Sequence, residues 1–302
     1  MAALFSGPGP EGRHRPHRQA AGLAPMDGAM SETVYSAAPE LADPAGFLAR
    51  AGADLGAALP AGWQLFRAQL RARRRRALLG GLWLLAPAAA ATLLCVYLQS
   101  RRLFAVGPTE LPYALHVLAG IVLWQTFHDA LNAPLARLSA ERQIVTRSRV
   151  PHEAVLLSGL WEVALNGAVR LAALAAALAL LGFVPAPSAL LLPLGLAALA
   201  LLGFALGLVA APFGLLWDDV RQALLLVAGF WFFMTPIVYP GPAAGWLRLN
   251  PVTPLLETAR SWLAGPGVAP GFFLVLALAA AALVLAWLLY RLARPHVTAR
   301  LG

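Results

Sequence analysis

Long apolar runs separated by short polar segments dominate the chain after residue 60. A helix of about 20 apolar residues, rising roughly 1.5 Å per residue, matches a ~30 Å hydrocarbon core. The runs that reach such lengths lie near residues 77–98, 112–131, 155–183, 188–215, 222–239 and 271–290. This pattern predicts an all-α integral membrane protein with six transmembrane helices. The second run is the weakest, because it carries His116, His128 and Asp129.

Between the fifth and sixth runs, residues 241–268 form a broken apolar stretch that contains several prolines. One helical piece is expected from Pro254 to about Ala264, with Thr253 as N-cap and Gly265 at its end. Such a piece covers about half of the hydrocarbon core. Irregular backbone is tolerated at that depth only inside protein or beside a cavity. We therefore expect a re-entrant helical segment between the last two spans.

The N-terminal part has a different composition. Residues 1–60 are rich in Gly, Pro and Ala with scattered charge, which predicts a disordered cytoplasmic tail. Residues 61–76 follow as an expected interfacial helix, and residues 77–295 then form the six-span transmembrane domain.

The expected interfacial helix has Trp63, Phe66 and Leu70 at helical spacing, with arginines on its other face. One interpretation is a basic anchor at the membrane surface. The other is that these arginines contact the anionic head group of a substrate through charge-assisted hydrogen bonds. The arginines concerned are Arg67, Arg71, Arg73, Arg74, Arg75 and Arg76.

The positions of the arginines predict the orientation of the chain in the membrane. They concentrate before the first run, in the 132–152 and 216–221 loops and in the C-terminal tail, so these parts are expected in the cytoplasm with both termini. The net charge of +9 then reflects membrane topology and contact with anionic lipids, and we infer no nucleic-acid binding from it.

The chain contains no lysine, and this excludes two kinds of chemistry. A Walker A loop needs a lysine to reach the nucleotide phosphates, and a Schiff-base enzyme needs one as its nucleophile. If ATP drives this protein, another chain must bind the ATP and its Mg²⁺. Only one cysteine is present, so no intramolecular disulfide can form.

Polar residues also occur where lipid would not tolerate them. Glu162, Asn166 and Arg170 are spaced four apart and share one face of the third predicted span. A charge at mid-bilayer costs at least about 2.5 kcal/mol, so Arg170 must face protein or water. The stripe either lines a channel or ties helices together, for instance through Glu162. The histidines of the second run have too few partners for a metal site, and no metal site is predicted.

Aromatic residues gather at the end of the fifth run: Trp231, Phe232, Phe233 and Tyr239. An interfacial aromatic belt would account for them. Aromatic faces inside a conduit would also suit the apolar faces of sugar rings. The fourth run carries Gly203 and Gly207, a small-residue face suited to close helix packing.

Several blocks between residues 62 and 295 resemble one family of transporters. They are Leu79-Gly80-Gly81-Leu82-Trp83 with its preceding arginines, Arg149-Val150-Pro151-His152-Glu153, Asp218-Asp219-Val220-Arg221, Trp231-Phe232-Phe233-Met234-Thr235-Pro236, and Leu249-Asn250-Pro251-Val252-Thr253-Pro254. In order and spacing the chain resembles the permease subunits of ABC-2 type exporters for polysaccharides and polyol phosphates, which include O-antigen, capsule and teichoic acid transporters. It departs from the family at His152, where an arginine is common.

The resemblance implies an ATP-driven exporter of the bacterial inner membrane that moves a lipid-linked polysaccharide out of the cytoplasm. Two permease copies would form the channel and two separate ATPase subunits would dock below it. The chain itself would be a transport subunit, without enzymatic activity or cofactor. Coupling to the ATPase is implied for Arg149, Val150, Pro151, His152 and Glu153. An outer re-entrant gate is implied for Asn250, Pro251, Thr253, Pro254, Glu257 and Arg260.

Other functions stay open at this stage. A related ABC-2 exporter of drugs or lipooligosaccharides is the nearest alternative. A proton-coupled carrier usually has more intramembrane carboxylates and an internal repeat. A membrane-embedded glycosyl- or acyltransferase would need a paired acid and base, for which only Asp218 and Asp219 offer themselves.

Overall fold

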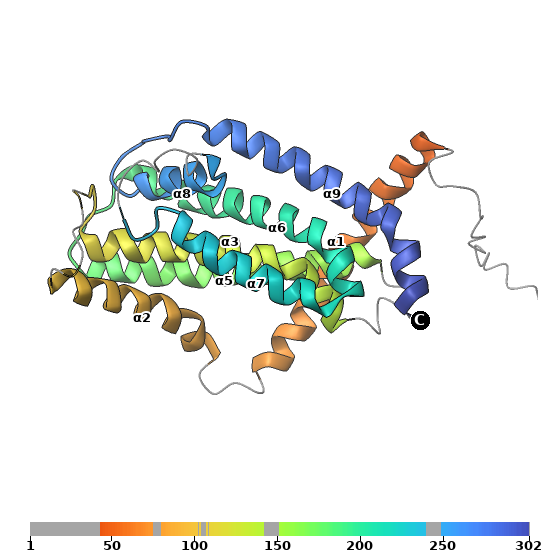
Figure 1. Cartoon of the computed structure of the whole chain (residues 1–302), viewed down its shortest axis with the longest axis horizontal. Helices are drawn as coiled ribbons and strands as arrows, with labels where there is room; N and C mark the ends of the chain where they lie inside the picture. The colour runs from red at the N-terminus through yellow and green to blue at the C-terminus, as the bar shows by residue number, and fades with distance from the viewer. Residues whose placement is uncertain are drawn as a thin grey trace, which may run out of the picture. The chain divides into compact units, whose positions relative to one another are not determined.

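The computed structural model describes residues 43–74, 80–101, 103, 107, 109–141, 151–239 and 249–301, with side chains described for all of these except residues 74, 80 and 295–301. All of them belong to one structural unit, Asp43–Gly302. Within these ranges the chain is helical and contains no strand. The helices, shown in Figure 1, are α1 Pro44–Arg74, α2 Gly80–Ser100, α3 Tyr113–Ala140, α5 His152–Leu180, the 3₁₀ helix η2 Pro187–Leu191, α6 Leu192–Leu216, α7 Asp218–Met234, α8 Val252–Ser261 and α9 Phe272–Leu301.

Four helical segments of the described chain are long and apolar enough to cross a membrane. They are Gly81–Ser100, His152–Leu180, Pro187–Leu216 and Phe272–Arg294. These match four of the six predicted spans, namely the first, third, fourth and sixth. The protein is thus an all-helical chain with the features of a membrane protein.

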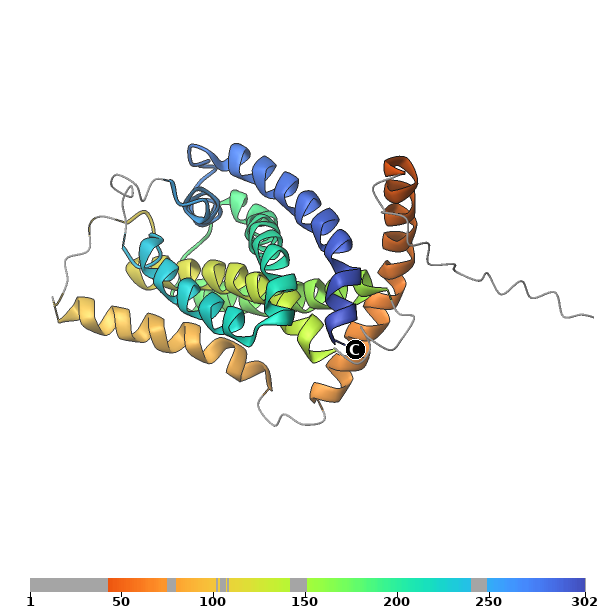
Figure 2. The same cartoon turned by 45° about the vertical axis from the view of Figure 1, so that its right-hand side comes forward.

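Helix α3 lies at the centre of the bundle, although its sequence is more polar than those of α2, α5, α6 and α9. In Figures 1 and 2 it runs beside α5, α6 and α7. Its buried residues cover most of its circumference, and Leu115, Leu123 and Phe127 are almost fully enclosed. Neighbouring helices therefore shield the polar groups of α3 on most sides.

Glycines of α6 allow its close approach to α3. A Cβ at Gly203 would clash with the carbonyl oxygen of Phe127, and one at Gly207 with that of Leu131. Small residues spaced four apart let two helix backbones pack in direct contact. This confirms the packing role expected for these two glycines, and the contact lies within one subunit.

The fifth predicted span has different bounds from those expected. Residues 222–239 were predicted to be one helix, but α7 ends at Met234 and Thr235 has extended backbone angles. The cause is Pro236, because the ring of a proline disfavours the helical conformation of the preceding residue. Tyr239 consequently lies in the bend formed by residues 235–239 instead of in the helix.

Helix α8 is a short helix in the predicted re-entrant region, but its start differs from the prediction. It begins at Val252 with Pro251 as N-cap, and Thr253 makes no capping hydrogen bond. Instead the Asn250 side-chain oxygen accepts a hydrogen bond of 3.0 Å from the Val252 backbone nitrogen. Most of α8 is buried, including Leu255 and Leu256.

The helix that was predicted to lie at the membrane interface also begins earlier than expected. Helix α1 starts at Pro44, so residues 44–60 are helical and not part of a disordered tail. Residues 1–42, for which the same disorder was predicted, lie outside the described residues. Part of α1 packs on α5, where Phe66 is buried and Trp63 contacts Trp161 edge to face at 5.0 Å.

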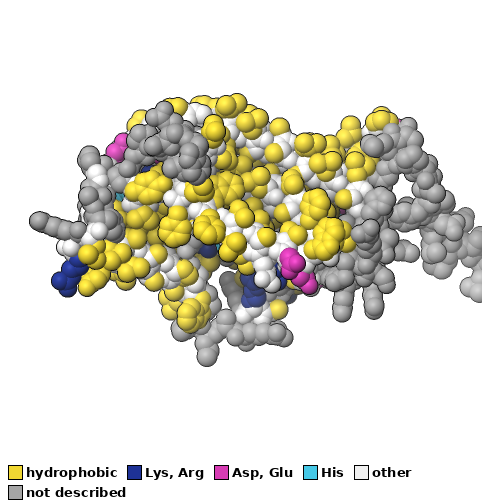
Figure 3. Space-filling view, in the orientation of Figure 1, with side chains coloured by type: hydrophobic (Ala, Val, Ile, Leu, Met, Phe, Trp, Pro, Cys, Tyr) yellow, Lys and Arg dark blue, Asp and Glu magenta, His cyan; other side chains and the backbone are white. Residues whose placement is uncertain are grey.

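Two helices leave most of their surface open. In α2 only Ala88 and Thr92 are buried among its described side chains, and in α7 only Ala228 is. Their open faces carry large apolar side chains. Figure 3 shows hydrophobic side chains, in yellow, over much of the visible face of the molecule. An apolar face of this extent requires lipid or a protein partner.

The α3–α6 contact can be tested by replacing Gly207 with Ala. The added methyl group would press on the Leu131 carbonyl oxygen, and overpacking of this kind costs about 1–3 kcal/mol. Gly229→Ala is the matched control, because a Cβ there meets nothing within 4 Å. Thermal unfolding in detergent should show a lower midpoint for Gly207→Ala only. Equal midpoints for the two variants would contradict the packing.

Candidate functional site

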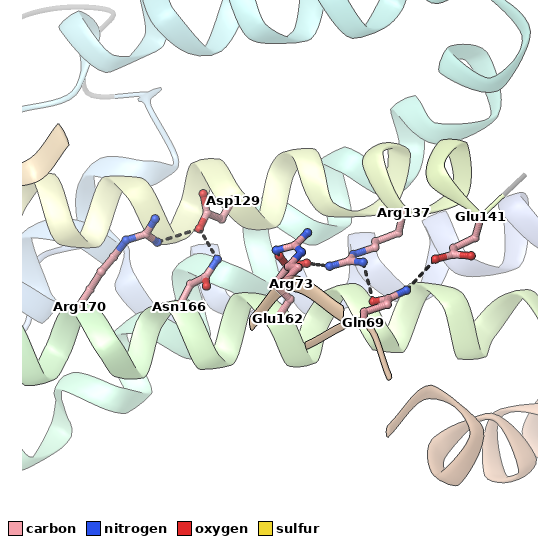
Figure 4. A network of polar contacts seen from close by, with 8 residues as sticks. All are labelled: Gln69, Arg73, Asp129, Arg137, Glu141, Glu162, Asn166 and Arg170. Atoms are coloured by element: carbon pink, nitrogen blue, oxygen red, sulfur yellow. Dashed lines mark hydrogen bonds and ion pairs between the residues drawn. The ribbon is translucent and has the colours of Figure 1, made fainter. Parts of the chain in front are cut away.

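Charged and polar side chains from α1, α3 and α5 meet along the inside of the bundle. Figure 4 shows them as a nearly continuous row, which we call the polar track. Its members are Gln69, Arg73, Asp129, Arg137, Glu141, Glu162, Asn166 and Arg170. The three residues predicted as a stripe on the third span all belong to it, and they divide between two groups.

In the first group, Asp129 of α3 holds two side chains of α5. The Arg170 guanidinium lies 2.8 Å from the Asp129 carboxylate, and the Asn166 amide donates to the same oxygen at 3.2 Å. Arg170 is only 4% exposed. The structure thus assigns Arg170 to a network between helices, and its partner is Asp129 instead of the expected Glu162.

In the second group, Glu162 lies between two arginines of other helices. Arg137 of α3 and Arg73 of α1 both pair with its carboxylate. Arg137 also donates to the Gln69 side-chain oxygen at 2.5 Å, and Gln69 in turn donates to Glu141 at 2.9 Å. These bonds fasten α1 to the ends of α3 and α5.

Arg137 lies beyond residue 131, where the apolar run of α3 ends. Burial, together with the neighbouring charge of Arg73, lowers its pKa to about 10, and the carboxylate of Glu141 opposes this shift. A guanidinium with this pKa remains charged at neutral pH. Arg137 therefore brings a positive charge to the side chain of Glu162 under ordinary conditions.

A pocket of about 330 Å³ opens beside the second group, and we call it the arginine pocket. Helices α1, α3, α5 and α7 line it. Its polar lining consists of Arg73, His128, Asp129, Asn132, Arg137, Glu162, Asn166 and Arg221. Figure 3 shows basic side chains within a hollow on the viewed face, with acidic side chains close by. The pocket combines the guanidinium groups of Arg73, Arg137 and Arg221 with the carboxylates of Asp129 and Glu162. Because Arg73 and Arg137 already pair with Glu162, Arg221 is the guanidinium of this lining that is offered to an anionic group.

The predicted head-group arginines are only partly brought to this pocket. Arg73 lines it, whereas Arg67 and Arg71 are exposed on α1 and are not among its lining residues. Arg74 ends α1, and its side chain is not described. Arg75 and Arg76 lie outside the described residues.

The predicted coupling residues that the structure describes lie at the start of α5, against the C-terminal half of α9. His152 and Glu153 are both buried. The His152 ring nitrogen Nδ1 lies 3.0 Å from the Tyr290 hydroxyl, and Glu153 pairs with Arg291 at 2.6 Å. Pro151 is the N-cap of α5, while Arg149 and Val150 lie outside the described residues.

Arg291 extends this junction to α1, because it also pairs with Asp54 at 2.7 Å. The contact joins the first and last described helices. His152 and Glu153 consequently lie beneath the surface, where α5, α9 and α1 meet.

At the opposite end of the bundle, Asn250 joins α7 to α8. Its side-chain oxygen accepts a hydrogen bond of 2.9 Å from the Trp231 indole, in addition to the bond from Val252. Its amide donates to the Thr235 hydroxyl at 2.9 Å. The predicted gate residue Asn250 therefore uses both ends of its amide to hold the bend after α7 against the start of α8.

Arg260 makes a second contact between these segments. Its guanidinium Nη1 donates to the Pro236 carbonyl oxygen at 2.9 Å, and the residue is 8% exposed. Thr258 of the same helix accepts a bond from the Ala269 backbone nitrogen at 2.9 Å. The remaining predicted gate residues, Pro251, Thr253, Pro254 and Glu257, lie on the same short helix or at its N-cap.

The four aromatic residues predicted as channel lining do not share one environment. Trp231 packs on Phe127 at 5.3 Å and Phe232 on Trp124 at 5.7 Å, so both rings are engaged with α3. Phe233 is 75% exposed and Tyr239 is 40% exposed. Only these last two present largely open rings.

Sequence reasoning missed several members of the site. It treated Asp129 as structural, and did not include Arg137, Arg221, Asn132 or Gln69 among the candidates. A signal existed for Asp129 and Arg137, because charges in or next to an apolar run require partners inside the bundle. For Gln69 and Asn132 nothing in the sequence distinguished them from surface polar residues.

Comparison of the sequence with protein-family models finds no match, and a search of curated proteins finds no similar sequence. The likeness to ABC-2 type permeases therefore rests on the sequence blocks described above.

The Asp129–Arg170 pair can be tested with a double-mutant cycle. Asp129→Ala should lower the free energy of unfolding by about 3–5 kcal/mol, because it leaves the buried Arg170 charge without its counter-charge. Adding Arg170→Leu should recover part of this loss. Unfolding of the four proteins in mild detergent measures the coupling. Additive effects of the two substitutions would show that the pair contributes nothing.

The role of Asn250 can be tested by hydrogen exchange. Asn250→Ala removes the hydrogen bonds to Trp231 and Thr235, so exchange should quicken in residues 252–261 and 235–239 while α5 is unaffected. Ser188→Ala, which removes a bond to the Trp262 carbonyl oxygen, is the control for a single lost contact. Unchanged exchange in Asn250→Ala would refute a holding role.

Proposed function

We propose that this chain is the membrane-spanning subunit of an ATP-driven exporter of the ABC-2 type, and that it moves a lipid-linked polysaccharide across the bacterial inner membrane. The observation that carries the proposal is the arginine pocket beside the polar track, in a bundle that contains four helices long and apolar enough to cross a membrane. A phosphate or pyrophosphate head group is the ligand that several guanidinium groups bind best.

Two spans beyond the four apolar helices are part of the proposal. Helix α3 would cross the membrane shielded by its neighbours, and α7 would cross beside the arginine pocket. Both termini would lie in the cytoplasm, as the distribution of arginines predicts. Helix α8 would then lie at the outer end as the re-entrant gate, held closed by Asn250 and Arg260.

The open apolar faces of α2 and α7 support pairing with a second copy of this chain. The arginine pocket would then open towards a channel between the two copies. Two ATPase subunits would supply ATP binding, since the chain has no lysine for a Walker A loop. Their movement would act on the start of α5, and the His152 and Glu153 contacts would pass it to α9 and α1.

The first experiment is to tag the chain in its native host, extract it in mild detergent and identify the co-purifying proteins by mass spectrometry. A P-loop ATPase in stoichiometric amount is the expected result. A preparation without an ATPase in several detergents would contradict the proposal. Flux that then depends on the proton gradient would favour a carrier, and product formation from a lipid-linked sugar would favour a transferase.

The arginine pocket gives a second test in the reconstituted complex. Arg221→Gln removes one guanidinium from an exposed position of the pocket, so export should fall by about tenfold or more, as expected for a lost charged hydrogen bond. Arg101→Gln is the matched control, because it makes the same change of charge just after the C-terminal end of α2 and outside the pocket. Equal export by the two variants would remove the pocket from the transport path.

A further inference from the structure

A second pocket lies at the α8 end of the bundle, away from the arginine pocket. Its volume is about 380 Å³, and the start of α3, helix α8 and the segment after α8 form its walls. Its lining residues are Thr109, Glu110, Leu111, His116, Glu257, Arg260, Ser261, Gly267, Val268 and Ala269. Small-ligand sites have volumes of about 300–1,000 Å³, so this pocket suits a small ligand.

His116 marks the pocket as a binding site. Its side chain lines the pocket, it is only 5% exposed, and its Nε2 atom has no hydrogen-bond partner among the described residues. An unpaired buried nitrogen is costly, which makes it a natural point of contact for a ligand hydroxyl.

The charges of the lining limit the kind of ligand. Glu110 and Glu257 contribute carboxylates, and Arg260 contributes a guanidinium. An anionic ligand would be repelled by the two carboxylates, and for a cationic ligand the guanidinium of Arg260 offsets one of the two carboxylates. Among the described residues no group of three or more His, Cys, Asp or Glu is placed to hold a metal ion. A neutral ligand is compatible with both signs of charge.

Hydroxyl groups satisfy each polar member of this lining. A hydroxyl both donates and accepts, so it can donate to Glu110 or Glu257 and accept from Arg260. It can pair with the His116 nitrogen in either tautomer. Leu111 and Val268 add apolar surface for the C–H faces of a ring. We propose that this pocket binds a neutral polyhydroxylated ligand, namely a sugar ring.

The second pocket shares Glu257 and Arg260 with the proposed gate. Arg260 lines the pocket and also donates to the Pro236 carbonyl oxygen, so a ligand here would contact the side chain that holds the bend after α7. On the proposed function, the pocket would take a glycan residue at the outer end of the channel. The binding itself does not depend on transport, and it can be measured without an ATPase.

The experiment uses the full chain in lipid nanodiscs, because sugar-headgroup detergents would occupy the pocket. Saturation-transfer NMR measures the affinities for glucose, glucosamine and glucuronate, which share a ring and differ in charge. The expected result is saturable binding of glucose in the millimolar range, tighter than that of either charged sugar. Tighter binding of a charged sugar, equal binding of all three, or no saturable binding would overturn the proposal.

Variants locate the site. Glu110→Ala, at an exposed position that does not disturb the core, should weaken glucose binding by about tenfold or more. His116→Leu should do the same by removing the unpaired nitrogen. Asp219→Ala, an exposed acid at the start of α7, is the control and should bind glucose as the unmodified chain does. Unchanged affinity in both pocket variants would place the sugar elsewhere and overturn the assignment.

Discussion

An arginine that is only 4% exposed among apolar helices needs a counter-charge, and Arg170 obtains it from Asp129 on the neighbouring helix. This requirement governs the arrangement of the bundle. The helix that supplies Asp129 also carries Arg137, so it cannot face lipid along its length. It must lie at the centre, and α5, α6 and α7 must surround it. The close approach of α6 through Gly203 and Gly207 completes this enclosure.

The two ends of the bundle are held by different means. Where α1, α5 and α9 meet, ion pairs such as Glu153–Arg291 and Arg291–Asp54 connect the helices. At the α8 end, side chains bind backbone carbonyl oxygens or one another, as Arg260 binds Pro236 and Asn250 binds Thr235. Ion pairs respond to neighbouring charge, whereas bonds to carbonyl oxygens depend on local backbone geometry. The two ends are therefore sensitive to different changes in their surroundings.

The sequence predicted the long apolar helices best, because length and composition alone decide whether a helix can cross a membrane. The runs at 77–98, 155–183, 188–215 and 271–290 correspond to α2, α5, α6 and α9. The end of α7 was predictable too, since Pro236 disfavours helix at Thr235, but the apolar residues up to 239 obscured it. The pairing of Arg170 with Asp129 was not predictable, because it depends on the rotation and register of two helices far apart in the chain. The resemblance to the exporter family still rests on sequence blocks, and the arginine pocket was found only in the structure.

The early end of α7 has a consequence for the surrounding bilayer. Seventeen residues make a helix about 26 Å long, which is shorter than a hydrocarbon core of ~30 Å. If α7 crosses the membrane, the mismatch is absorbed by local thinning of the bilayer beside it, by flanking side chains that reach to the interface or by association with another copy. Thinning brings lipid head groups and water closer to the bend at residues 235–239. The exposed end of that bend, at Tyr239, would then be hydrated from the membrane surface, and the protein would be sensitive to the acyl-chain length of the lipids around it.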